Sequence, residues 1–143
     1  MVRLLVAEDY PPLAKVIAIA CQREGYEVER AGSKVRALAV PGAFDAAVID
    51  LDLVDGRGTD LALALRREGR VGVVVFLASD SDHELCTAAA RLGRVIQKES
   101  GVDELMACVR ESLEHVRQLA QAVGSEHSTI ALVARSGLHK RVR

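Results

Sequence analysis

Leu4-Leu5-Val6-Ala7-Glu8-Asp9 is the stretch that decides the fold, because a short apolar run ends here in two acidic residues. The whole run, Val2 to Ala7, is broken only by Arg3, which is typical of a strand buried on both faces of a sheet. Pro11 and Pro12 then suit the first turn of a helix, and apolar residues at helical spacing follow them. The sequence therefore begins with a buried strand and an amphipathic helix.

The same alternation continues along the chain. We expect further strands over 26–30, 43–50, 71–78 and 94–97, and further helices over 33–40, 59–68 and 81–92, with a last helix opened by Ser100. Parallel neighbouring strands need crossover helices, and these crossovers are almost always right-handed. The pattern predicts an α/β fold, a flavodoxin-like three-layer sandwich whose five-stranded parallel sheet has the order 2-1-3-4-5 and carries five helices.

Size and charge limit the classes of function. A chain of 143 residues suits one domain with a full core and is too short for two. Its 19 Lys and Arg against 20 Asp and Glu give a net charge of -1, without the basic excess of a nucleic-acid-binding protein. The apolar stretch 71–78 is far shorter than the ~18 residues of a membrane span. We therefore expect a cytoplasmic protein that does not bind membranes.

The chain divides near residue 122. The helical pattern loosens from Leu119, and Gly124-Ser125-Glu126 indicates a break before the apolar segment 130–134. The last nine residues contain four basic side chains and no acid: Arg135, Lys140, Arg141 and Arg143. We expect a domain over 1–122 and a tail over 123–143, which is either a flexible solvated segment or a contact with nucleic acid or a partner protein.

The cysteines and histidines give no sign of a metal site. Cys21, Cys86 and Cys108 form no Cys-x-x-Cys pair and fall on apolar helix faces, which is typical of buried reduced thiols. The four histidines are scattered without ligand spacing: His83, His115, His127 and His139.

Charged residues follow three of the expected strands where each strand ends. Glu8 and Asp9 follow the first strand, Asp50 ends the third, and Lys98 follows the fifth. Open parallel sheets bind ligands beyond the carboxyl ends of their strands, so we expect one pocket here. Each residue alone has an ordinary explanation as a helix-start, cap or solvated residue. Together they predict a pocket for a magnesium-bound phosphoryl group on Asp50.

The chain resembles the receiver domain of two-component response regulators over roughly residues 1–122. The resemblance rests on four pieces: Leu4-Leu5-Val6-Ala7-Glu8-Asp9, Gly25-Tyr26-Glu27-Val28, Val48-Ile49-Asp50-Leu51-Asp52-Leu53-Val54-Asp55-Gly56, and Lys98. It implies that Asp50 takes a phosphoryl group from a sensor histidine kinase or phosphotransfer protein, which alters a protein-binding face. It implies a signalling domain of a phosphorelay, not a turnover enzyme, and allows a homodimer through the fourth and fifth helices.

The resemblance also implies a cofactor, Mg²⁺ or Mn²⁺. The carboxylates of Asp9 and Asp50 suit direct coordination, because Mg²⁺ prefers hard oxygen ligands. The backbone carbonyl of Asp52 is the third protein ligand that the resemblance implies, and Glu8 would act through water. Lys98 would stabilise the new phosphoryl oxygens. Phosphoryl transfer is catalysed mainly by positioning and charge neutralisation, so these few groups suffice.

Three positions depart from the receiver pattern. Receivers usually end the fourth strand with Thr or Ser, but Ala78 falls at that position. Ser79 would supply the switch hydroxyl only after a shift of one residue, and is otherwise a cap of the following helix. Val95 stands where the aromatic switch residue is usual, and Val54 replaces a common proline. The main alternative is therefore a receiver-like module that binds its partner without phosphorylation.

Two enzyme classes are further alternatives. Asp50-Leu51-Asp52-Leu53-Val54 also resembles the D-x-D-x-[T/V] motif of haloacid-dehalogenase-type phosphatases, in which the first Asp is phosphorylated. Here the motif lies on the expected third strand instead of the first, and the chain leaves little room for a cap domain. A Glu followed by D-x-D also resembles Toprim nucleic-acid enzymes, which the near-neutral charge does not favour.

Overall fold

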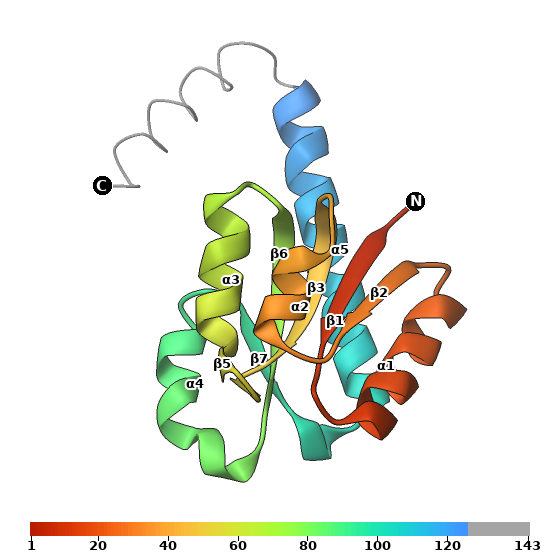
Figure 1. Ribbon diagram of the computed structural model, residues 1–143. Helices are drawn as coiled ribbons and strands as arrows, with labels where there is room; N and C mark the ends of the chain where they lie inside the picture. The colour runs from red at the N-terminus through yellow and green to blue at the C-terminus, as the bar shows by residue number, and fades with distance from the viewer. Residues whose placement is uncertain (126–143) are drawn as a thin grey trace.

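The structure is a computed structural model that describes residues 1–125, and its centre is a parallel sheet (Figure 1). The five strands are β1 (Arg3–Ala7), β2 (Glu27–Ala31), β3 (Phe44–Asp50), β6 (Val71–Ala78) and β7 (Arg94–Gln97). Their order is β2-β1-β3-β6-β7, and every neighbouring pair is parallel. In chain order this is the predicted 2-1-3-4-5 arrangement, so the predicted sheet is confirmed.

Five helices cover the two faces of the sheet: α1 (Pro11–Arg23), α2 (Lys34–Ala39), α3 (Gly58–Arg67), α4 (His83–Ala89) and α5 (Val102–Ser125). Successive strand residues point to opposite faces, and the two hydrophobic cores show this alternation. Leu4 and Val6 share a core with residues of α1 and α5, whereas Leu5 and Ala7 share one with residues of α2, α3 and α4. The predicted three-layer sandwich is therefore confirmed.

The structure adds short elements that the sequence analysis did not predict. β4 (Asp52–Leu53) and β5 (Gly56–Arg57) form a separate antiparallel hairpin directly after β3. The 3₁₀ turns η1 (Asp80–Asp82) and η2 (Lys98–Ser100) precede α4 and α5. The predicted start of α5 at Ser100 was wrong, because Ser100 ends η2 and Gly101, at φ 92°, makes the bend before the helix. Similarly, α4 is shorter than the predicted 81–92 because η1 takes up its first residues.

α5 continues through Gly124 to Ser125, so the domain boundary predicted at residue 122 falls within a helix. The rest of the predicted tail, with its four basic residues and two of the histidines, lies outside the described residues. Within residues 1–125, no helix combines the length and apolar character that a membrane crossing requires.

All three cysteines are free thiols. Cys21 and Cys108 are buried, as expected, whereas Cys86 on α4 is only half-buried. Burial raises the pKa of the Cys21 thiol to about 11, so this cysteine is unreactive at neutral pH.

Candidate functional site

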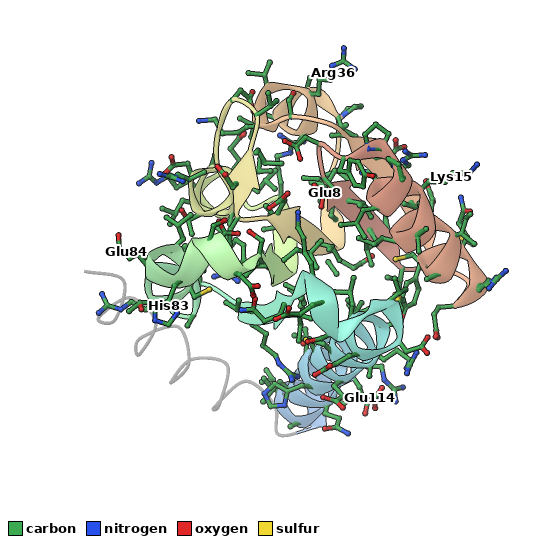
Figure 2. The ribbon with its side chains drawn as sticks, turned by 90° about the horizontal axis from the view of Figure 1, so that it is seen from below. Glu8, Lys15, Arg36, His83, Glu84 and Glu114 are labelled. Atoms are coloured by element: carbon green, nitrogen blue, oxygen red, sulfur yellow. The ribbon has the colours of Figure 1, made fainter. Side chains whose placement is uncertain are left out.

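The register of the parallel strands sets the acidic residues side by side at the carboxyl edge of the sheet. Ala7 is paired with Ile49, so Glu8 and Asp50, one position further along, lie level with each other. Alternation sends both side chains to the face that carries α1 and α5, because the residues two positions earlier point into that core. Figure 2 is seen from this edge and shows Glu8 near its centre.

Lys98 joins the two buried carboxylates. Its Nζ lies 2.9 Å from Asp50 Oδ2 and 3.0 Å from Glu8 Oε1. The side chains of Glu8 and Asp50 are 0% and 3% exposed, whereas that of Lys98 keeps 28%. The ammonium thus lies beside two carboxylates that solvent barely reaches.

The Lys98 ammonium does not fully offset the effect of burial on the pKa of Glu8. Burial, reinforced by the neighbouring Asp50, raises the pKa of Glu8 from 4.5 to about 8 despite the opposing effect of Lys98. Burial lowers the pKa of Lys98, but its hydrogen bond to Asp50 and its ion pair with Glu8 outweigh this and leave that pKa raised. Glu8 therefore holds its proton more tightly than an ordinary glutamate, because Lys98 does not offset the burial of two acids, and a further cation would favour the ionised form.

The donor set fits a hard divalent cation. Carboxylate oxygens of Glu8, Asp9 and Asp50 lie within 4.8 Å of one another, and Asp9 is exposed to solvent. Within residues 1–125, Glu8 Oε1 is buried and accepts no well-formed hydrogen bond, although the Lys98 ammonium is close. A buried anionic oxygen without a hydrogen-bond donor is costly. Three convergent carboxylates with such an oxygen suit Mg²⁺ or Mn²⁺, which take oxygen ligands.

The loop after Asp50 is held in place by a close helix approach. The N–H of Asp52 donates to Asp50 Oδ1 at 3.0 Å, and the N–H of Gly58 donates to the Leu51 carbonyl at 2.9 Å. A Cβ at Gly58 would lie 2.2 Å from the Asp50 carbonyl oxygen, so only glycine lets α3 begin here. The sequence analysis missed this role, although the second glycine of Gly56-Arg57-Gly58 was a signal of a tight turn.

Asp55 is a second residue that the sequence analysis did not assign. Its carboxylate accepts hydrogen bonds from the N–H groups of Lys34 and Val35, at 2.7 and 3.0 Å. These are the first two residues of α2, so the loop that follows Asp50 caps a neighbouring helix. These hydrogen bonds lower the pKa of Asp55 below its ordinary value. Asp-Gly at 55–56 indicated a turn but not its distant partner.

The residues at the predicted switch positions make their contacts elsewhere than with the carboxylates of the site. Ala78 is fully buried in the core under α3 and α4, and Val95 packs against the same core. Ser79 Oγ lies 3.0 Å from Asp82 Oδ2, which also accepts from the Ser79 N–H at 2.8 Å. This capping box begins η1 and is the cap geometry given above as the other explanation for Ser79. Within residues 1–125, no hydrogen bond links Ser79 to Asp50.

Comparison with known proteins assigns the family. The family model for the response regulator receiver domain matches residues 4–110. This chain belongs to that family. The transcriptional regulator RpaA of Synechocystis is 29% identical over 143 residues, which cover 91% of this chain and 56% of RpaA. RegX3 of Mycobacterium tuberculosis, a sensory transduction protein, is 28% identical over 92% of this chain and 56% of its own length. The receiver thus spans about half the length of these relatives.

Solved receiver structures share the fold of this chain. The non-phosphorylated HemR receiver domain of Leptospira biflexa is 27% identical, with a TM-score of 0.69 over 79% of this chain and 94% of HemR. TrrA of Thermotoga maritima, solved with Mg²⁺ and beryllofluoride, is 23% identical with a TM-score of 0.68, covering 78% and 99%. The architecture described above is therefore that of a two-component receiver.

Proposed function

We propose that this receiver accepts a phosphoryl group on Asp50 from the phosphohistidine of a sensor histidine kinase or a phosphotransfer protein. One observation carries the proposal: Lys98 Nζ lies 2.9 Å from Asp50, beside three carboxylates that fit a divalent cation. A carboxylate nucleophile between an ammonium and a metal site is the arrangement that phosphoryl transfer needs.

The residues divide the chemistry between them. An Asp50 carboxylate oxygen attacks phosphorus in line, the new O–P bond forms, and the P–N bond to the donor imidazole breaks. Lys98 leaves its ion pair with the free carboxylate and binds the phosphoryl oxygens. Mg²⁺, held by Asp9, Asp50 and the Asp52 carbonyl, with Glu8 acting through water, would neutralise charge on the phosphoryl group.

The donor protein has an apolar surface to dock on beside the site. α1 begins at Pro11, two residues after Asp9, and Tyr10, Val16 and Ile19 are 61%, 49% and 38% exposed. Val16 and Ile19 also line a groove of about 420 Å³ between α1 and α5. A partner bound there would have its histidine near the carboxyl edge of the sheet. We also propose a cytoplasmic location, where a kinase and its receiver can meet.

Phosphorylation by a small donor tests the proposal. Incubation with acetyl phosphate and Mg²⁺ should add one phosphoryl group, detected by intact mass, and Asp50→Asn should abolish the adduct. Asp52→Asn is the matched control, since only the backbone of Asp52 takes part, and it should keep the adduct. An unmodified wild type, or an adduct that persists in Asp50→Asn, would refute the proposal.

A phosphorylation-independent binding module is the second candidate. It is favoured by Ala78 and Val95 at the two switch positions and by an Asp50 side chain only 3% exposed. Amide hydrogen exchange with and without beryllofluoride separates the two. A change in the exchange protection of amides in η1, α4 and β7 on adding beryllofluoride supports phosphate-driven signalling. Amide protection that is unchanged throughout the domain supports the phosphorylation-independent binding module. Steady turnover of an aryl phosphate would instead indicate a phosphatase.

A further inference from the structure

The C-terminal half of α5 extends beyond the sheet (Figure 1). Its first turns are buried, with Leu105 and Val109 at 2% and 0% exposure, but every residue from 114 to 124 is exposed. Val116, Leu119 and Val123 are 47%, 52% and 41% exposed. Helices in proteins draw most of their stability from packing an apolar face, so this exposed apolar stripe is suited to contact with a further apolar segment.

The stripe follows a seven-residue repeat. Val116 and Val123 are spaced by seven, and the same spacing extends in the sequence back to Val109, which is buried in the domain's own core, and forward to Ile130. Leu119 lies three positions after Val116, and Val133 three after Ile130. β-branched residues at the first core position with Leu at the second favour two-stranded parallel coiled coils. Ser112 and Glu126 interrupt the second position, so the pairing is weak.

We propose that this segment of α5 pairs with the same segment of a second copy of the chain, in a parallel two-stranded coiled coil. A second copy fits because the stripe is self-complementary: parallel pairing sets Val116 and Val123 each against its own counterpart. Ala120 flanks this seam and lets the helices approach. Glu114 and Arg117 lie at outward positions of the repeat and form their own ion pair, 2.6 Å long, so no like charges meet across the seam.

The chain's own segment 130–134 is the competing occupant. Below the extension lies a groove of about 660 Å³, lined among others by Tyr26, Leu113 and Val116. A fold-back would bury the same valines but leave the protein monomeric. The pairing surface lies at the opposite end of the domain from the hairpin β4–β5, which follows Asp50 (Figure 1), so the proposal does not depend on phosphorylation.

Sedimentation equilibrium of the full chain tests the proposal. The wild type should rise towards twice the monomer mass at tens of micromolar, and Val116→Glu with Val123→Glu should raise the dimer dissociation constant at least tenfold. Gln118→Glu with Gln121→Glu adds the same charge on the outward face and should change it less than twofold. Equal thermal unfolding of the variants shows that the domain stays folded. A wild type that stays monomeric, or valine variants that dimerise like it, would overturn the proposal.

Cross-linking tests the parallel register. In a Cys86→Ser background, Val123→Cys should form an intermolecular disulfide on mild oxidation, whereas Gln121→Cys should not. Adding Asp50→Asn to either cysteine variant should leave its cross-linking unchanged. Loss of phosphorylation can therefore be distinguished from loss of the dimer. Equal cross-linking at the two positions would contradict the coiled coil.

Discussion

At Glu8, burial of the carboxylate lowers the stability of the metal-free protein, while the same carboxylate is suited to binding a cation. Its side chain is inaccessible to solvent and sits beside Asp50, and within residues 1–125 its Oε1 atom accepts no well-formed hydrogen bond. Its raised pKa means that the folded protein binds this proton more tightly than the unfolded chain does. Stability therefore falls as pH rises from the ordinary pKa of 4.5 to the folded value of about 8. The metal-free site is destabilised by the charge that suits it to a cation.

Glu8→Gln should stabilise the metal-free protein. The amide keeps the shape of the side chain and removes the buried charge, so we expect about 2 kcal/mol more unfolding free energy at pH 8 and no gain at pH 4.5. Urea denaturation in EDTA at the two pH values measures this. Glu99→Gln, an exposed glutamate, is the control and should change little. A Glu8→Gln variant less stable than wild type at pH 8 would show that the ion pair with Lys98 outweighs burial.

At the scale of elements, α3 and α2 are both fixed to the loop that follows Asp50. α3 begins at Gly58 against the Asp50 backbone, and α2 begins under the carboxylate of Asp55. The short hairpin β4–β5 joins these two contacts. The loop after β3 is thus linked to two helices, independently of the predicted switch positions Ala78 and Val95.

Gly58→Ala should disturb this arrangement strongly. The added Cβ would fall 2.2 Å from the Asp50 carbonyl oxygen, so α3 must move away from β3. We expect a loss of about 3 kcal/mol in urea denaturation, with slower phosphorylation of Asp50 because its backbone shifts too. Gly32→Ala has open space around its Cβ and should cost less than about 0.5 kcal/mol. Equal stability of the two variants would mean that the close approach of α3 to the Asp50 backbone does not require glycine at position 58.

Asp55→Ala should weaken the start of α2 in a pH-dependent way. The pKa of Asp55 is lowered by its backbone hydrogen bonds, so its stabilising effect is present above the unfolded pKa and is lost as pH falls through the folded one. We expect a lower Tm than wild type at pH 7 and equal Tm values near pH 2.5, by differential scanning calorimetry. The Tm of Asp55→Asn, which keeps one acceptor oxygen, should lie between those of wild type and Asp55→Ala at pH 7. A Tm difference that persists at the lowest pH would exclude the charged cap.

For the molecule as a whole, the strand pattern and the charges at strand ends predicted most of what the structure contains. Buried parallel strands are continuous apolar runs, so their order and the meeting of Glu8, Asp50 and Lys98 followed from general rules. Gly58 and Asp55 were not predicted, because their roles depend on contacts with distant backbone atoms. The ion pair of Lys98 with the free Asp50 carboxylate was also not predicted, since strand-end position does not say which way a lysine turns.

Divalent cations should stabilise the whole domain through the same three carboxylates. A ligand that binds only the folded state adds about 1.4 kcal/mol for each tenfold excess over its dissociation constant. We therefore expect the Tm to rise steadily with Mg²⁺ or Mn²⁺ at constant ionic strength, and Asp9→Asn to remove most of the rise. Asp9 is exposed, so its substitution costs the fold little, while Asp52→Asn should keep the full response. A wild-type Tm that ignores Mg²⁺, or an Asp9→Asn chain that responds fully, would show that these oxygens do not act together on a cation.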